Sequence, residues 1–171
     1  LPHVAGMTVQ QVRAENHRLD GMEWMTTGDR AIVHFLREQP PGTVIVEAVG
    51  DAYSEYARLS SASGVPAHLG WANHESVWRG GEILEETNRR RDLMIDIYTS
   101  GDAEEIREAV EEAGIHLVAI GSLERKDFSD GQLARLAAAG AVVLDQDGGL
   151  VVRFGAPVFG GAALGADMME P

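Results

Sequence analysis

The side chains most able to bind a ligand or to react gather between Val44 and Arg79. They are polar and aromatic residues that follow short apolar runs: Glu47, Asp51, Tyr53, Ser54, Glu55, Trp71, Asn73, His74, Glu75, Trp78 and Arg79. A segment that serves folding alone rarely concentrates so many such groups just after strands. This segment therefore contains the best candidates for a functional site.

His74 and Glu75 could together supply a metal ligand or a general acid–base couple, because imidazole is both a common metal ligand and a base at neutral pH. Two observations weigh against both roles. Adjacent residues point in different directions, and no second histidine lies at helical spacing from His74. We expect no metal ion and no cofactor, and the sequence identifies no catalytic residue.

Other residues of this segment have a structural interpretation beside a functional one. Trp71 and Trp78 could form a platform on which a sugar or another ring stacks, or they could cover an edge of a sheet. Glu47 follows an apolar run, where a carboxylate is costly unless it is paired. Structural pairing of Glu47 with Arg79 or Arg125 is as reasonable as a catalytic role.

Composition limits the class of protein. The chain has 171 residues, of which 44% are hydrophobic and 24% charged, as expected for one globular domain. The net charge of −13 argues against a nucleic-acid partner, because phosphate binding needs clustered Lys and Arg. The chain has no cysteine, and no apolar run reaches about 18 residues, the length of a membrane span. Because it begins at Leu1, we expect it to be a fragment of a longer protein that includes membrane segments.

Several common motifs of enzymes and nucleotide-binding proteins are missing. Ser54 is not part of a G-x-S-x-G sequence, and no G-x-G-x-x-G follows the first predicted strand. The chain also has no G-x-x-x-x-G-K-[ST] loop. As an isolated enzyme, the chain would lack a complete catalytic set.

Alternating strand and helix patterns surround the candidate residues. Buried strands are predicted at 43–48, 66–69 and 116–120, and a hairpin from 141–144 and 150–154. Helices are predicted at 30–39 after an Asp29 cap, at 54–62, at 92–98, at 103–113 after an Asp102 cap and at 129–139. The charged stretch 80–92 is predicted as a solvated loop or helix. The run from Glu124 to Lys126 has the composition of a solvated turn.

This alternation predicts an α/β fold with a mostly parallel, Rossmann-like three-layer sheet and an antiparallel C-terminal hairpin. Residues 29–155 would form the domain, residues 1–28 a lead-in and residues 156–171 a flexible Gly/Ala-rich tail. Ligands of such sheets bind beyond the carboxyl ends of the strands. We therefore predict one shared cleft, lined by residues that follow the three strands: Glu47, Tyr53, Ser54, Trp71, His74, Glu75, Trp78, Arg79, Glu124 and Arg125.

Four short motifs occur in order within residues 19–145. They are Glu47-Ala48, Tyr53-Ser54-Glu55-Tyr56-Ala57-Arg58-Leu59-Ser60, Gly70-Trp71 with His74-Glu75 and Trp78-Arg79, and Gly121 with Glu124-Arg125. Together they resemble the C-terminal region of the YYY-type multi-pass membrane proteins, also catalogued as domain of unknown function 2298. The His-Glu-x-x-Trp-Arg part is quite specific, and the departures at Ala67-His68 and Asp127-Phe128 lie outside the motif core.

The resemblance implies a soluble, extracytoplasmic domain that follows a membrane-embedded portion of the same polypeptide. The membrane parts of that family are similar to multi-pass glycosyltransferases that use polyprenyl-phosphate sugars, with the catalytic carboxylate in a loop between membrane helices. Such a domain would shape the acceptor side without carrying the catalytic base. Its expected partners are the membrane portion and a saccharide or lipid-linked sugar, and no nucleic acid.

The residues alone leave other classes of function open. A free-standing α/β enzyme, or a protein that binds a small ligand or a nucleotide, could use the same strand-end cleft. The motif could also be only a folding core.

Overall fold

The computed structural model describes residues 21–79 and 83–155, apart from the side chains of Ser76 and Arg79. Three predicted segments fall wholly or partly outside the described residues: the lead-in as far as residue 20, positions 80–82 of the charged stretch and the Gly/Ala-rich tail from residue 156. The division of the chain into lead-in, domain and tail stays a prediction.

The described strands form one mixed, four-stranded sheet in the order β1-β2-β4-β3. β1 (Ile45–Val46) runs parallel to β2 (Leu117–Ile120), whereas β4 (Gly149–Arg153) is antiparallel both to β2 and to β3 (Ala141–Gln146). The α/β class and the C-terminal hairpin are confirmed. The prediction of a mostly parallel, Rossmann-like sheet is wrong, because one of the three strand pairings is parallel.

Two local features make the sheet mixed. The predicted strand at 66–69 pairs with β1 only through a bridge between Ala67 and Ile45, since Pro66 has no backbone N–H to donate to a ladder. The hairpin turns at Asp147 and Gly148, both of which have positive φ, and it places β4 directly beside β2. A parallel neighbour at that position would need a longer crossover connection.

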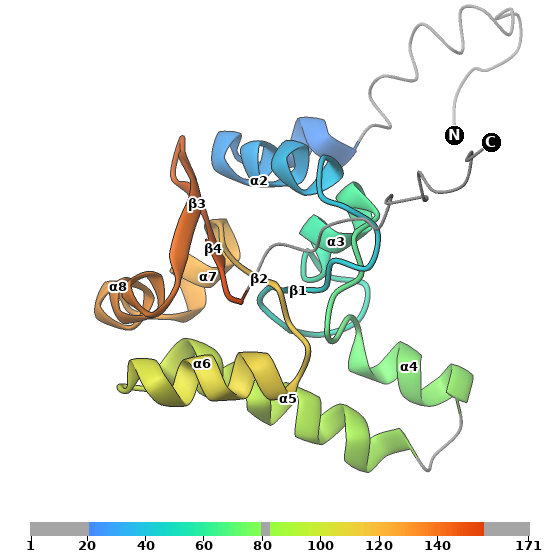
Figure 1. Cartoon of the computed structure of the whole chain (residues 1–171). Helices are drawn as coiled ribbons and strands as arrows, with labels where there is room; N and C mark the ends of the chain where they lie inside the picture. Colours follow the sequence, from blue (N-terminus) through green and yellow to red (C-terminus); the bar gives the residue numbers. More distant parts are fainter. Residues whose placement is uncertain (1–20, 80–82, 156–171) are drawn as a thin grey trace, which may run out of the picture.

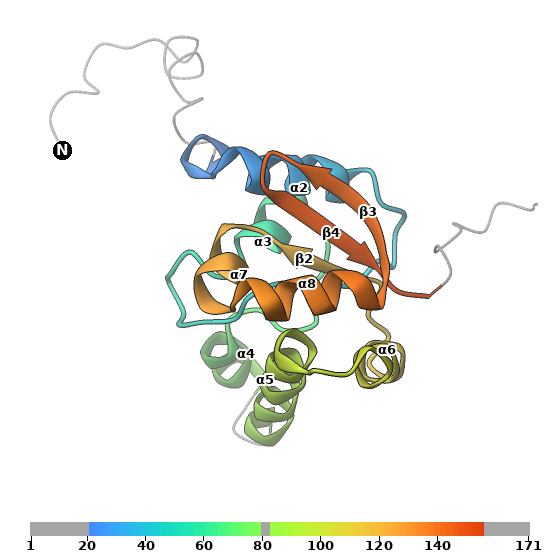
Figure 2. The ribbon, with the colours of Figure 1, turned by 90° about the vertical axis from the view of Figure 1, so that its left-hand side faces the viewer.

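Helices cover both faces of this sheet (Figures 1 and 2). In chain order they are the 3-10 helix η2 (Gly21–Trp24), α2 (Thr27–Arg37), α3 (Arg58–Ser63), α4 (Ala72–Arg79), α5 (Leu84–Thr99), α6 (Ala103–Glu112), α7 (Ser122–Asp127) and α8 (Asp130–Ala139). Side chains of α2 and α3 pack on one face, and side chains of α5, α6 and α8 pack on the other.

Capping residues set several helix boundaries. α6 begins after the predicted Asp102 cap, α8 begins after Ser129, and α3 ends at Gly64 as predicted. α2 begins earlier than predicted, because Thr26 rather than Asp29 is its cap and accepts a hydrogen bond from the Asp29 N–H at 3.1 Å. The carboxylate of Asp29 is therefore available for contacts in the interior.

Three helices are longer than predicted or were not predicted. α5 extends through the charged stretch, because Met94, Ile97 and Tyr98 form a buried stripe at helical spacing beneath its charged face. α4 carries most of the predicted site residues that follow the second strand. α7 replaces the predicted solvated turn, and its Glu124 is fully buried.

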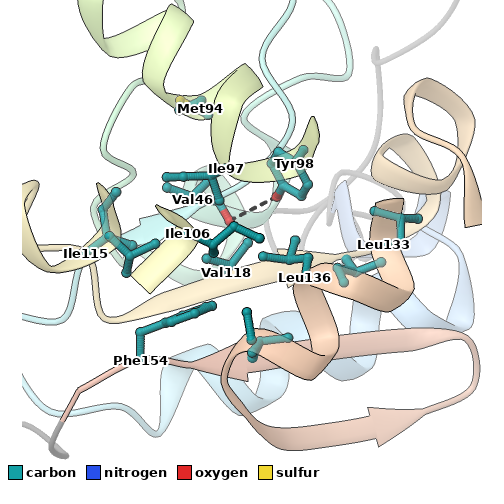
Figure 3. Close-up of a cluster of buried hydrophobic side chains, with 14 of the residues drawn as sticks. Val46, Met94, Ile97, Tyr98, Ile106, Ile115, Val118, Leu133, Leu136 and Phe154 are labelled. Carbon is teal, nitrogen blue, oxygen red and sulfur yellow. Dashed lines mark hydrogen bonds between the residues drawn. The ribbon is translucent and has the colours of Figure 1, made fainter. Parts of the chain in front are cut away.

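The alternation of side chains along the strands divides the interior into two hydrophobic clusters. Val118 and Ile120 of β2 belong to the cluster formed with α5, α6 and α8, whereas Leu117 and Ala119 belong to the cluster formed with α2 and α3. Figure 3 shows the first cluster, with Val118 among side chains of the surrounding helices. Both faces of β2 are thus buried, and this burial fixes the position of the residues that follow the strand.

Candidate functional site

The residues that follow the strands separate into two places and do not share one cleft. The first place holds four charged side chains that are buried or nearly so, here called the buried charge network: Asp29, Glu47, Arg58 and Glu124. The second place is an open pocket beside α3 and α4 that is lined by aromatic side chains.

Arg58 is the cation of the buried charge network. Its guanidinium donates two hydrogen bonds to the Asp29 carboxylate, at 2.9 and 3.1 Å, and one to Glu124 Oε2 at 3.2 Å. The Asp29 carboxylate also accepts hydrogen bonds from the backbone N–H and the hydroxyl of Ser122. These contacts join α2, α3 and α7, which are distant in the sequence.

The two glutamates of the network bind backbone N–H groups. Glu124 accepts from the Ala48 N–H at 2.6 Å and from the Gly121 N–H at 2.7 Å, so it connects the chain after β1 to the chain after β2. Glu47 accepts from two consecutive N–H groups of α3, both at 2.9 Å, and thereby fixes the start of that helix. Both glutamates are 0% exposed, so neither reaches a ligand at the surface.

These surroundings shift the pKa values of the network. Burial raises the pKa of Asp29, but hydrogen bonds from Arg58 and Ser122 outweigh burial and leave that pKa below its ordinary value. Burial also raises the pKa of Glu47, whose hydrogen bonds to α3 do not offset it, and the nearby Glu124 adds to the rise. Burial alone would lower the pKa of Arg58, yet the contacts with its two carboxylates raise it.

Gly121 stands where the network leaves no room for a side chain. A Cβ at this position would lie 2.2 Å from Asp29 Oδ1 and 2.8 Å from Arg58 Nη2. A glycine therefore lets the backbone after β2 approach the charged groups closely enough to donate to Glu124. Gly121 and Glu124, which belong to the last of the four sequence motifs, thus have a role in packing.

In the second place, three rings surround His74 and form with it the aromatic cluster. The ring centroids of Tyr53, Trp71 and Trp78 lie 4.6, 5.2 and 6.1 Å from that of His74. Trp71, His74 and Trp78 are spaced at i, i+3 and i+7, so α4 and the residue before it present them on one face. Tyr53 has a φ of 60°, which is uncommon for a residue with a side chain, and its ring contacts both Trp71 and His74.

An open pocket of about 590 Å³, here called the aromatic pocket, lies against this cluster. Its lining includes Ser60, Ser61, Trp71, His74, Glu75 and Trp78. Four predicted site residues therefore come together here, and Tyr53 adjoins them through its ring contacts. The volume lies in the range of small-molecule sites, about 300–1,000 Å³.

Hydrogen bonds fix the walls of the aromatic pocket. Trp71 Nε1 donates to the Tyr56 carbonyl at 2.8 Å, and the Tyr56 hydroxyl donates to the Asp127 carboxylate at 2.8 Å. Glu75 Oε1 accepts from the Gly70 N–H at 3.2 Å. On the opposite wall, α3 is held by the buried charge network. Through these hydrogen bonds, the walls of the pocket are connected to the chain that follows β1 and to the chain that follows β2, the two parallel strands.

Of the three other predicted site residues, Ser54 and Arg125 lie apart from the pocket. Ser54 is exposed, and its hydroxyl donates to a backbone carbonyl of its own loop. Arg125 is also exposed and donates to the Gly148 carbonyl at 3.0 Å, so the prediction that it pairs with Glu47 is wrong. The backbone of Arg79 ends α4, but its side chain lies outside the described part, and its contribution stays a prediction.

Asp29 and Arg58 were not predicted as members of any site. Arg58 could have been inferred, because a carboxylate after a buried strand needs a partner and Arg58 is the one cation within residues 53–60. Asp29 offered no such signal, since its position suits an ordinary helix cap. The approach of Ser122 depends on the backbone path after β2.

His74 and Glu75 do not act as a hydrogen-bonded couple in the structure. The ring of His74 lies in the aromatic cluster, whereas Glu75 accepts from a backbone N–H. In residues 21–79 and 83–155, no group of three or more His, Cys, Asp or Glu side chains could hold a metal ion.

Among the described helices, none is both long enough and apolar enough to cross a membrane. Comparison of the chain with protein-family models, with curated proteins and with solved structures found no match.

Proposed function

We propose that this domain binds a saccharide in the aromatic pocket. In the whole protein it is the extracytoplasmic accessory domain of a multi-pass membrane protein that resembles glycosyltransferases using lipid-linked sugars. There it positions the acceptor and does not carry the catalytic base. One observation carries the proposal: a pocket that combines tryptophan faces with serine hydroxyls and a carboxylate.

The chemistry of the lining suits a sugar ring. A pyranose has apolar C–H groups on its two faces and hydroxyl groups around its edge. Trp71 and Trp78 offer flat apolar surfaces for a face, and Trp78 is 84% exposed, so most of its ring is open to a ligand. Ser60, Ser61 and Glu75 offer donors and acceptors for the hydroxyls. Apolar walls with a few polar groups are typical of small-molecule sites.

The buried charge network favours a binding domain over a free-standing enzyme at the strand ends. A general base must come within hydrogen-bond reach of the proton that it removes. Glu47 and Glu124 are fully buried and already accept hydrogen bonds from backbone N–H groups. These contacts give both carboxylates a structural role, because they hold α3 and the ends of the strands in place.

Two observations support a position beside a membrane portion. The four motifs within residues 19–145 resemble those of the YYY-type membrane proteins. In addition, α4 carries two neighbouring apolar side chains that are largely exposed, Val77 at 77% and Trp78 at 84%. Exposed apolar groups next to a pocket are typical of surfaces that meet a ligand or a partner.

Calorimetric titration of the chain with neutral mono- and oligosaccharides tests the binding proposal. We expect saturable binding that Trp78→Ala weakens by about tenfold, because the variant loses the apolar surface of the indole ring, and about 1.4 kcal/mol corresponds to a factor of ten. The melting temperature of Trp78→Ala should stay close to that of the wild type, since the side chain is largely exposed.

Trp24→Ala is the matched control. Trp24 is also 84% exposed, but it lies on η2 and does not line the pocket. We expect this variant to bind as the wild type does. Equal loss of binding in the two variants, or no effect of Trp78→Ala, would contradict a saccharide site in the aromatic pocket.

A further inference from the structure

The charged residues that line the aromatic pocket bear on the class of sugar that would bind there. Among the described residues that line it, Glu75 is the one Asp, Glu, Lys or Arg. Arg58 follows the lining residue Ala57 in the chain, but its guanidinium is directed to Asp29 and Glu124 in the buried charge network. Besides His74, the described lining thus presents a carboxylate to a ligand and no lysine or arginine to offset it.

Glu75 is held in place for this role. Its Oε1 atom accepts the Gly70 N–H at 3.2 Å, which anchors the side chain at the start of α4. The carboxylate has a second oxygen with capacity to accept from a ligand. This hydrogen bond favours a position of the carboxylate beside the pocket.

We propose that the aromatic pocket favours amino-bearing over uncharged sugars and uncharged sugars over those that carry a carboxylate or a phosphate, with Glu75 as the residue that discriminates. This inference rests on the proposed saccharide binding and adds the class of sugar. An ammonium group beside Glu75 gains a charge-assisted hydrogen bond, whereas an anionic group meets a like charge. The net charge of −13 over the whole chain acts in the same direction.

The test uses methyl glycosides that differ in one group only. Methyl glucoside, galactoside and mannoside are each compared with their 2-amino and uronic acid counterparts by calorimetric titration at low salt. Within the series that binds, we expect the amino sugar to bind at least about fivefold tighter than the neutral one, and the uronate at least about fivefold weaker, as for unit charges about 4 Å apart in water. Added salt should reduce both differences.

Glu75→Gln isolates the charge, because the amide oxygen can still accept from the Gly70 N–H. We expect this variant to melt as the wild type does and to bring the affinities for the amino, neutral and uronic acid sugars within about twofold of one another. Arg79→Gln should leave the order of affinities unchanged, which tests the nearby cation whose side chain lies outside the described part.

The results separate the two proposals. If none of the nine glycosides and none of the neutral oligosaccharides binds, both the proposed function and the inference about charge are wrong. If neutral sugars bind but the uronates bind as tightly or more tightly, the inference alone is overturned. The same holds if Glu75→Gln leaves the order unchanged, or if uronate binding depends on Arg79.

Discussion

Arg58 neutralises two carboxylates, Asp29 and Glu124, that lie far apart in the chain. Its side chain is 10% exposed, and the two carboxylates are 2% and 0% exposed. At this burial, removal of one partner leaves charges that neither water nor a counter-ion can compensate. The contribution of Arg58 to stability is therefore best seen when it alone is replaced.

Arg58→Met should lower the free energy of unfolding by about 3–5 kcal/mol, because Asp29 and Glu124 would be left buried without their cation. Urea denaturation followed by circular dichroism measures the change. Arg89→Met is the control: Arg89 pairs with Glu86 while its side chain is 76% exposed, so the free energy of unfolding of this variant should stay close to that of the wild type. Equal stability of Arg58→Met and Arg89→Met would mean that the network contributes no more than a surface pair.

Gly121→Ala should destabilise the fold by about 1–3 kcal/mol, as is usual when a side chain is forced into a packed interior. The added Cβ would lie 2.2 Å from Asp29 Oδ1 and force the carboxylate away from Arg58. Gly131→Ala is the matched control. Its Cβ would make an ordinary contact of 3.7 Å with Arg135, within the exposed face of α8.

For Gly131→Ala we expect unchanged or slightly higher stability, by up to about 1 kcal/mol, because alanine favours helix over glycine. Thermal melts of the two variants and the wild type make the comparison. A melting temperature of Gly121→Ala at or above that of the wild type would show that the interior can accept a methyl group there.

At the scale of elements, Glu47 connects β1 to α3, and Asp29 connects α2 to α3 and α7. The two connections respond to pH in opposite directions. The pKa of Asp29 is lowered below 3.8, so its contribution to stability is present above that pH and is lost as the pH falls through the lower value. The pKa of Glu47 is raised above 4.5, so its contribution is present below that pH and is lost as the pH rises through the higher value.

We therefore expect Asp29→Asn and Glu47→Gln to show opposite trends when urea denaturation is measured from acid to neutral pH. The stability lost in Asp29→Asn should shrink as the pH falls below 3.8. The stability lost in Glu47→Gln should shrink as the pH rises above 4.5. Losses that vary with pH in the same direction for both variants would contradict this assignment of the pKa shifts.

Elements with strong local signals could be predicted from the sequence. α6, α8 and β2 agree with prediction because their caps and apolar patterns are local. α5 could be predicted only in part, since its buried stripe of Met94, Ile97 and Tyr98 lies among many charged residues. The order of the strands depends on long-range pairing, and no local pattern places β4 beside β2.

The candidate site, too, could be predicted only in part from the sequence. Trp71, His74 and Trp78 could be grouped from their spacing once they are placed on a helix. The burial of Glu124 could not be predicted, because a run of Glu, Arg and Lys has the composition of a solvated turn. What buries Glu124 is the position of Ala48 and Arg58, both more than sixty residues away in the chain.

At the scale of the whole molecule, the proposed attachment to a membrane portion makes a prediction about the gene that encodes this chain. The reading frame upstream of Leu1 should encode several apolar segments of about 20 residues each, the length that spans a bilayer. Sequencing of the gene and membrane fractionation of its full product check this. A start codon immediately before Leu1 would contradict a preceding membrane portion.

The proposed extracytoplasmic position can be measured separately. Alkaline phosphatase, which folds only after export, would be fused after Pro171 in the full-length protein. We expect an active fusion. A reporter active only in the cytoplasm, placed at the same point, should then be silent, and the reverse pattern would put the domain on the other side of the membrane.

The chain has three tryptophans, of which two line the aromatic pocket and the third, Trp24, lies on η2. Replacement of Trp24 by phenylalanine would leave only indole rings that a bound sugar can shield from water. The emission spectrum of that variant would then report occupancy of the pocket directly, through a blue shift on binding. The proposed saccharide binding would thus be followed by an optical probe that the protein itself contains, without a label and in real time.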